Sequence, residues 1–214
     1  MRTIIGFLAG TLLLVQACKN EDNKSENRET VQPAAKDSLL VTETSWGLVH
    51  KNADIESLRS VFGASEVVDS TILGPEGIDT LQVTYVFPGK AKEMIISWKD
   101  SFYHKRIGFI ETYQPEAPYR TENGLKVGST FKQLLDANGQ PINFSGFGWD
   151  YGGHIISYNK GKLDSSHIVY RLTSEASLPD ELYGDTELNT TLPAVQQHME
   201  KIIVYSITLN LYEH

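Results

Sequence analysis

Large apolar residues occupy alternate positions in five segments of the chain, a pattern typical of strands with one buried face. The segment nearest the C-terminus is the longest, and it places polar Ser206, Thr208 and Asn210 on the opposite face. The apolar residues are Leu81, Val83, Tyr85 and Phe87; Met94, Ile96 and Trp98; Ile107, Phe109 and Tyr113; Ile168, Tyr170 and Leu172; and Ile203, Tyr205, Ile207, Leu209 and Leu211. Turn signals at Pro88 and Gly89, and at Gly152 and Gly153, separate some of them. The pattern predicts an antiparallel sheet with one face in water.

Three short segments follow the helical period instead, at residues 53–62, 130–138 and 193–200. The first two stop at glycines, and the third begins with a proline, which is well tolerated in a first turn. Their inward-facing residues are Ile55, Leu58 and Phe62; Phe131, Leu134 and Leu135; and Val195 and Met199. We therefore expect the α+β class, with two or three short helices packed on one face of the sheet.

The first two predicted helices lie in similar sequence surroundings. Gly47-Leu48 precedes the helix that ends with Leu58 and Gly63, and Gly124-Leu125 precedes the one that ends with Leu134 and Gly139. A helix beside an antiparallel sheet, repeated over residues 45–160, resembles the small units of β-lactamase-inhibitor-like and outer-membrane-assembly lipoproteins. The resemblance implies two tandem units. The alternative is coincidence, because many helices end at glycine.

The N-terminal residues form a separate pattern. Arg2 precedes an apolar run over residues 4–15, which is shorter than the roughly 20 residues that span a bilayer. The run ends in Val15-Gln16-Ala17-Cys18, and Cys18 is the single cysteine. This arrangement resembles the signal peptide and lipobox of bacterial lipoproteins. The resemblance implies removal of residues 1–17 and acylation of Cys18 by a diacylglycerol thioether and a further chain such as palmitate. The alternative is an ordinary signal peptide cleaved after Ala17.

Composition divides the remainder into a tether and one domain. Residues 18–40 contain few apolar side chains and are expected to form a disordered tether, which leaves residues 41–214 as a single α+β domain. The formal net charge of the chain is −8. A negative body is repelled by nucleic acid and by an anionic membrane surface, so we expect no nucleic-acid partner. Membrane attachment is expected through the lipid on Cys18, at the bacterial outer membrane, facing the periplasm or the cell surface.

No complete catalytic pattern is present. Ser129-x-x-Lys132 matches the serine and lysine arrangement of penicillin-binding proteins, but no Lys-Thr-Gly follows, and a capping box from Thr130 to Gln133 explains the same residues. The six histidines show no metal-ligand spacing, although His154 and His167 could meet across paired strands. We therefore predict no catalytic residue, no metal site and no cofactor.

Residues 144–153 have the most distinctive composition in the chain, with aromatic rings framed by glycines beside a carboxylate. Such a loop suits a sugar or a peptide, and the candidate ligand-binding residues are Phe147, Trp149, Asp150 and Tyr151. The alternative is a tight hairpin whose aromatic residues complete the core. A stretch without Lys or Arg follows Arg171, and its acidic residues are expected to be solvated: Glu175, Asp180, Glu181, Asp185 and Glu187.

These features favour a membrane-anchored, non-catalytic binding or envelope-assembly module with a protein or glycan partner. Two alternatives stay open: a small cell-envelope hydrolase that uses Ser129 or a histidine, and a structural spacer.

Overall fold

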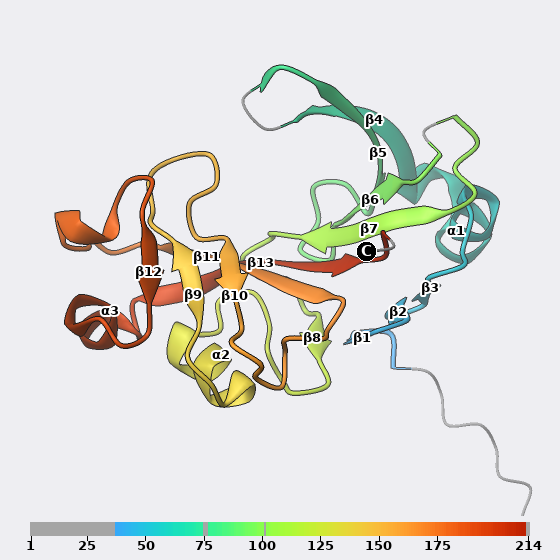
Figure 1. Ribbon diagram of the computed structural model, residues 1–214. Helices are drawn as coiled ribbons and strands as arrows, with labels where there is room; N and C mark the ends of the chain where they lie inside the picture. Colours follow the sequence, from blue (N-terminus) through green and yellow to red (C-terminus); the bar gives the residue numbers. More distant parts are fainter. Residues whose placement is uncertain (1–36, 75–76, 101, 213–214) are drawn as a thin grey trace, which may run out of the picture. The chain divides into compact units, whose positions relative to one another are not determined.

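The computed structural model describes residues 37–74, 77–100 and 102–212 (Figure 1). The predicted signal peptide, Cys18 and the tether up to residue 36 lie outside the described residues. Among those described, no helix combines the length and apolar character needed to span a bilayer. The described chain contains three α-helices and three sheets, which confirms the α+β class.

The largest sheet has six strands in the order β11-β13-β7-β6-β5-β4, and every neighbouring pair is antiparallel. Five of these strands were predicted from the alternating apolar residues. The edge strand β4 was not. The bounds are Val67–Leu73 for β4, Thr80–Val86 for β5, Met94–Trp98 for β6, Ile107–Thr112 for β7, Ile168–Ser174 for β11 and Ile202–Asn210 for β13. Figure 1 shows the β4–β5 hairpin curving away from the other four strands.

Two smaller sheets accompany the large one. The four-stranded sheet has the order β3-β2-β1-β8, and its β1–β8 pair is parallel. Its strands are β1 (Leu40–Thr42), β2 (Ser45–Trp46), β3 (Val49–His50) and β8 (Arg120–Thr121). The three-stranded sheet has the order β10-β9-β12, with strands β9 (Asn143–Ser145), β10 (Ile155–Ser157) and β12 (Glu187–Asn189). A single sheet is therefore the wrong description, because segments of two or three residues carry no detectable period.

The three helices form where the apolar stripes predicted them. They are α1 (Ile55–Phe62), α2 (Phe131–Asn138) and α3 (Pro193–His198), with short 3-10 turns η1 (Ala64–Glu66) and η3 (Asp180–Leu182). Reciprocal capping boxes begin α1 at Asp54 and α2 at Thr130. Helix α2 contacts β13 and α1 contacts β4, whereas α3 contacts η3. The helices thus pack against different elements, and the tandem arrangement of the first two is not evident.

The predicted face of β13 requires a correction. Tyr205 was expected to share a buried face with Ile203, yet it is 40% exposed, while Val204 and Ser206 are buried. The cause is a β-bulge: Arg171 pairs with Ser206 and Leu172 with Val204, so Tyr205 is an extra residue between them. The alternation shifts by one position there, and Ile207 and Leu209 return to the core.

Candidate functional site

The loop over residues 146–154 is fixed to strand β11 by its glycines. Gly153 has a φ of +75°, and its amide donates to the carbonyl oxygen of Ser145 at 3.0 Å. The amide of Leu172 donates to the carbonyl oxygen of Gly153 at 2.8 Å. A Cβ atom on Gly153 would lie 1.9 Å from the carbonyl oxygen of Leu172. Only glycine permits this approach of the loop to the sheet.

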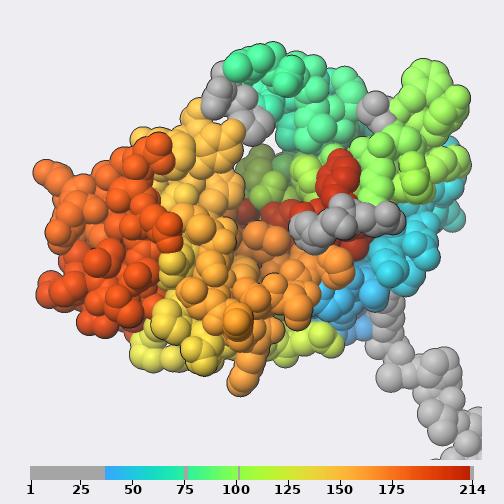
Figure 2. Space-filling view, in the orientation of Figure 1, coloured from blue at the N-terminus to red at the C-terminus, as the bar shows by residue number. Residues whose placement is uncertain are grey.

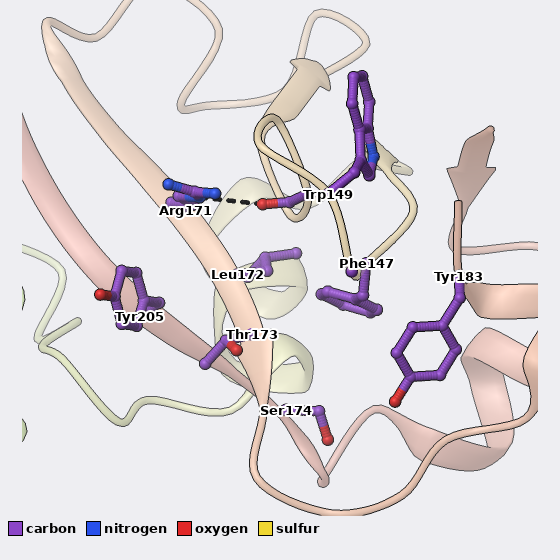
Figure 3. A pocket seen from close by; sticks show the side chains of 10 residues that line it. Phe147, Trp149, Arg171, Leu172, Thr173, Ser174, Tyr183 and Tyr205 are labelled. Carbon is purple, nitrogen blue, oxygen red and sulfur yellow. Dashed lines mark hydrogen bonds between the residues drawn. The ribbon is translucent and has the colours of Figure 1, made fainter. Parts of the chain in front are cut away.

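Arg171 on β11 also binds the main chain of this loop. Its Nε donates to the carbonyl oxygen of Gly152 at 2.9 Å (Figure 3), and a terminal guanidinium nitrogen donates to that of Asp150 at 2.8 Å. The bulged Tyr205 ring lies 5.9 Å from the guanidinium carbon. These two charge-assisted hydrogen bonds join the main chain of the loop to β11.

The four predicted site residues do not share one environment. Phe147 is 7% exposed and packs against Phe144 at a ring distance of 5.9 Å, so it belongs to the core. Trp149 is half-buried and donates from its indole nitrogen to the carbonyl oxygen of Gly146 at 2.8 Å. Asp150 and Tyr151 are exposed. The hairpin interpretation therefore accounts for Phe147, and the other three residues remain candidates for ligand contact.

Two hollows meet at this loop. The smaller, of about 280 Å³, contains Phe147 and Trp149 in its lining, together with Tyr183 and Tyr205 (Figure 3). The larger, of about 810 Å³, contains Asp150 and Tyr151. Among the residues that the structure describes, Arg171 alone lines both hollows.

The larger hollow, which we call the sheet trough, lies on the open face of the six-stranded sheet. Ile96, Ile110 and Leu209 pair across β6, β7 and β13 and belong to the core. Side chains alternate along a strand, so the neighbouring row of paired Glu111, Thr208 and Val169 faces the opposite way. Figure 2 shows the hollow beneath the β4–β5 hairpin. Its lining comprises Ile72, Leu73, Gly74, Gly77, Leu81, Phe109, Glu111, Asp150, Tyr151, His154, Val169, Tyr170, Arg171, Ser206 and Thr208.

The trough combines apolar walls with a small polar centre. Leu73 is 71% exposed and Val169 is 36% exposed, although both line the trough. At the centre, the Thr208 hydroxyl donates to a carboxylate oxygen of Glu111 at 3.1 Å. An apolar hollow with a few fixed polar groups is the usual form of a binding site.

The acidic segment that follows β11 forms part of the neighbouring structure. Its carboxylates are exposed, as expected for solvated groups. The segment's main chain binds the aromatic loop, because the amide of Phe147 donates to the carbonyl oxygen of Leu182 and the amide of Gly184 donates to that of Phe147, both at 2.8 Å. The segment therefore supports the loop from the side opposite β11.

The Ser129 and Lys132 side chains have separate partners. The Ser129 hydroxyl oxygen accepts from the amide of Lys126 at 3.0 Å, and the Lys132 ammonium group donates to Asp136 at 2.8 Å. The predicted capping box is present, with Thr130 accepting from the amide of Gln133 and Gln133 accepting from that of Thr130. The capping interpretation of this motif is thus confirmed.

His154 and His167, which could have met across paired strands, have other main-chain partners. His154 forms an isolated bridge with Arg171, and the amide of Asn210 donates to the carbonyl oxygen of His167. Within the described ranges, no three His, Cys, Asp or Glu side chains are grouped so that they could hold a metal ion.

Comparison with known proteins adds a structural likeness. No family model and no curated protein sequence matches the chain. The chain is similar to the crystal structure of the uncharacterized protein yfeY from Escherichia coli, with a TM-score of 0.48 and 16% identity, covering 79% of this chain and 98% of that one. A likeness of this size establishes neither family nor function.

The trough itself was not predicted from the sequence. Four of its lining residues, Ile72, Phe109, Tyr151 and Val169, come from stretches far apart in the chain. The sequence signal for β4 was weak, because both of its faces mix apolar and polar residues, as Val68 and Ser70 do on one of them.

Proposed function

We propose that this protein is a lipid-anchored, non-catalytic binding module of the bacterial cell envelope, and that the sheet trough holds an extended segment of a partner protein. One observation carries the proposal. The open face of the six-stranded sheet leaves Leu73, Val169 and Tyr151 exposed around one hollow of about 810 Å³. Exposed apolar groups gathered around one concavity mark interaction sites.

The lining favours a polypeptide over a glycan. Four aliphatic side chains line the trough, at Ile72, Leu73, Leu81 and Val169. Of its Phe and Tyr rings, Tyr170 is buried and Phe109 half-buried, and Tyr151 is exposed. Sugars bind mainly by stacking on flat rings, whereas aliphatic walls accommodate the side chains of a peptide. Glu111 provides a carboxylate oxygen in the trough that can accept from a peptide amide.

The anchoring half of the proposal depends on Cys18 and its resemblance to a lipobox cysteine. Two acyl chains bind a membrane stably, since each buried methylene contributes about 0.8 kcal/mol. Intact mass of the native membrane form measures acylation and cleavage together. A Cys18→Ser variant that fractionates and is processed like the wild type would remove this half of the proposal.

Site-specific photocrosslinking tests the trough. A photoreactive residue at position 169 is expected to give a protease-sensitive adduct in intact cells, and one at Ile156, which is 51% exposed outside the trough, is expected to give none. A Thr208→Arg change fills the centre of the trough and should abolish the adduct at 169. A protease-resistant adduct sensitive to periodate would indicate a glycan instead. Equal crosslinking from positions 169 and 156 would contradict a site in the trough.

The hydrolase alternative has a direct test of its own. A fluorophosphonate or penicillin probe that labels the protein, with labelling lost in Ser129→Ala, would establish it. The described partners of Ser129 and Lys132 make us expect no such labelling.

A further inference from the structure

The connection between β6 and β7 exposes two aromatic side chains next to each other. Phe102 is 84% exposed and Tyr103 is 68% exposed, with their rings in edge contact at 5.0 Å. Single exposed apolar residues are common on protein surfaces. An adjacent pair of rings with this exposure is a concentrated apolar surface that nothing in the described chain covers.

Hydrogen bonds close the base of this connection. The amide of Lys99 donates to the carbonyl oxygen of Arg106 at 2.8 Å, and the carboxylate of Asp100 accepts from the amides of Lys105 and Arg106 at 3.0 and 3.1 Å. The His104 ring stacks on Trp98 at 5.1 Å, with an interplanar angle of 11°. The amide of Ile55 donates to the carbonyl oxygen of His104 at 3.1 Å. The fold therefore holds the aromatic pair outward from a fixed base.

Three basic residues, Lys99, Lys105 and Arg106, belong to the same connection as the pair. Together with Lys51 they line a hollow of about 380 Å³. Within the described residues, the ammonium groups of Lys51 and Lys99 form no ion pair, although the whole chain carries a net charge of −8. The side chains that line this hollow therefore carry a positive formal charge, opposite in sign to the net charge of the whole chain.

Three carboxylates lie in or beside this hollow, and two of them pair with its basic side chains. Glu43 accepts from the Ser166 hydroxyl at 2.6 Å and from the amide of His167 at 2.7 Å. Asp54 caps α1 and pairs with Lys105 at 2.9 Å. Asp100 accepts from the main chain of the connection itself and pairs with Arg106 at 3.7 Å. The unpaired lysines thus remain available to an anionic partner.

We propose that this aromatic–basic surface, made of Phe102, Tyr103, Lys51, Lys99, Lys105 and Arg106, contacts the headgroup layer of an anionic phospholipid bilayer. Aromatic side chains of amphipathic character favour the membrane interface, where rings enter the acyl boundary and polar groups stay in water. Lysines near such a surface are attracted to lipid phosphates. This contact is a second membrane signal, separate from acylation and from the trough, and it orients the domain at the bilayer.

Vesicle binding by the Cys18→Ser chain tests this contact without acylation. With vesicles of phosphatidylethanolamine and phosphatidylglycerol, we expect Phe102→Ser/Tyr103→Ser to lower binding about tenfold. Lys99→Glu should lower binding at least about fivefold, and raised salt should weaken it. The matched control Ile156→Ser, an exposed apolar residue elsewhere, should bind like its parent. Equal binding by the loop variants and the control overturns the proposal.

Insertion can be measured directly because the Cys18→Ser chain contains no other cysteine. A polarity-sensitive fluorophore attached at Tyr103→Cys should shift to shorter wavelength on addition of the anionic vesicles and not with pure phosphatidylcholine. The same label at Ile156→Cys should not respond. A blue shift at position 103 that depends on protein concentration and not on vesicles would indicate a second copy of the chain as the occupant, and would likewise overturn the membrane contact.

Discussion

Replacing Gly153 by alanine should separate the aromatic loop from the large sheet. Gly153 has a φ of +75°, and its added Cβ would lie 1.9 Å from the carbonyl oxygen of Leu172. That oxygen belongs to a strand in the six-stranded sheet, so the loop must move instead. A displacement large enough to relieve the contact lengthens both hydrogen bonds that join Gly153 to Ser145 and Leu172.

The expected cost follows from these contacts. Each main-chain hydrogen bond contributes about 1 kcal/mol net, so the two together give about 2 kcal/mol. A non-glycine residue in the left-handed region costs about 1 kcal/mol more. Gly89 is a matched control, because its φ is +71° but the space around its Cβ position is open. Gly89→Ala therefore carries only the conformational cost, and the two variants should differ by about 2 kcal/mol.

Urea unfolding measures this difference. With a denaturant slope of about 2 kcal/mol per molar urea, the midpoint of Gly153→Ala should fall about 1.5 M below that of the wild type, and Gly89→Ala only about 0.5 M below it. Similar slopes for all three proteins show that the change lies in the native state. Equal midpoints for the two variants would refute the close packing of Gly153 against β11.

Three further changes test other parts of the fold. Phe131→Ala removes a fully buried ring that contacts Phe144, and it should lower the free energy of unfolding by about 3–5 kcal/mol in the same urea assay. Asp54→Ala should lower the free energy of unfolding by about 1 kcal/mol and Asp54→Asn by much less, because asparagine also caps helices. Hydrogen bonds from the Ser57 side chain and amide and from Lys105 hold the pKa of Asp54 below its usual range. The stability advantage of aspartate over asparagine should therefore disappear as the pH falls through that lowered pKa. Burial raises the pKa of Tyr170 to about 12, so its hydroxyl stays protonated in the folded state at a pH where the unfolded chain's hydroxyl ionises. The free energy of unfolding should therefore fall between a pH of about 10 and about 12, and it should fall less steeply in Tyr170→Phe. Identical slopes of stability against pH in the two proteins would contradict this assignment.

Much of the large sheet was predictable because its strands alternate regularly. Met94, Ile96 and Trp98 follow the period of a strand and lie in β6, although Ile95 and Ser97 between them are buried as well. Thr130 and Gln133 likewise indicated the start of α2, since a capping box depends on residues only three apart. Local patterns of this kind are readable from sequence because the interaction and the signal occupy the same few residues.

The bulge at Tyr205 was not predictable in this way. Its cause is the pairing of Arg171 with Ser206 and of Leu172 with Val204, and that register depends on a second strand. The sheet trough shows the same limit, because Phe109, Tyr151 and Val169 meet only after several strands have paired. Sequence reasoning did select the loop that contains Trp149, Asp150 and Tyr151, but it could not separate them from the core residue Phe147.

Strand β13 has a consequence for the order of folding. It is the last strand along the described chain, yet it lies between β11 and β7 inside the large sheet. Before residues 202–210 have been synthesised, β7 and β11 lack the partner that joins them, and the earlier strands form only a smaller, incomplete sheet. Pairings this distant in sequence form slowly. The six-stranded sheet therefore cannot close until residues 202–210 have been synthesised and have paired with both β7 and β11.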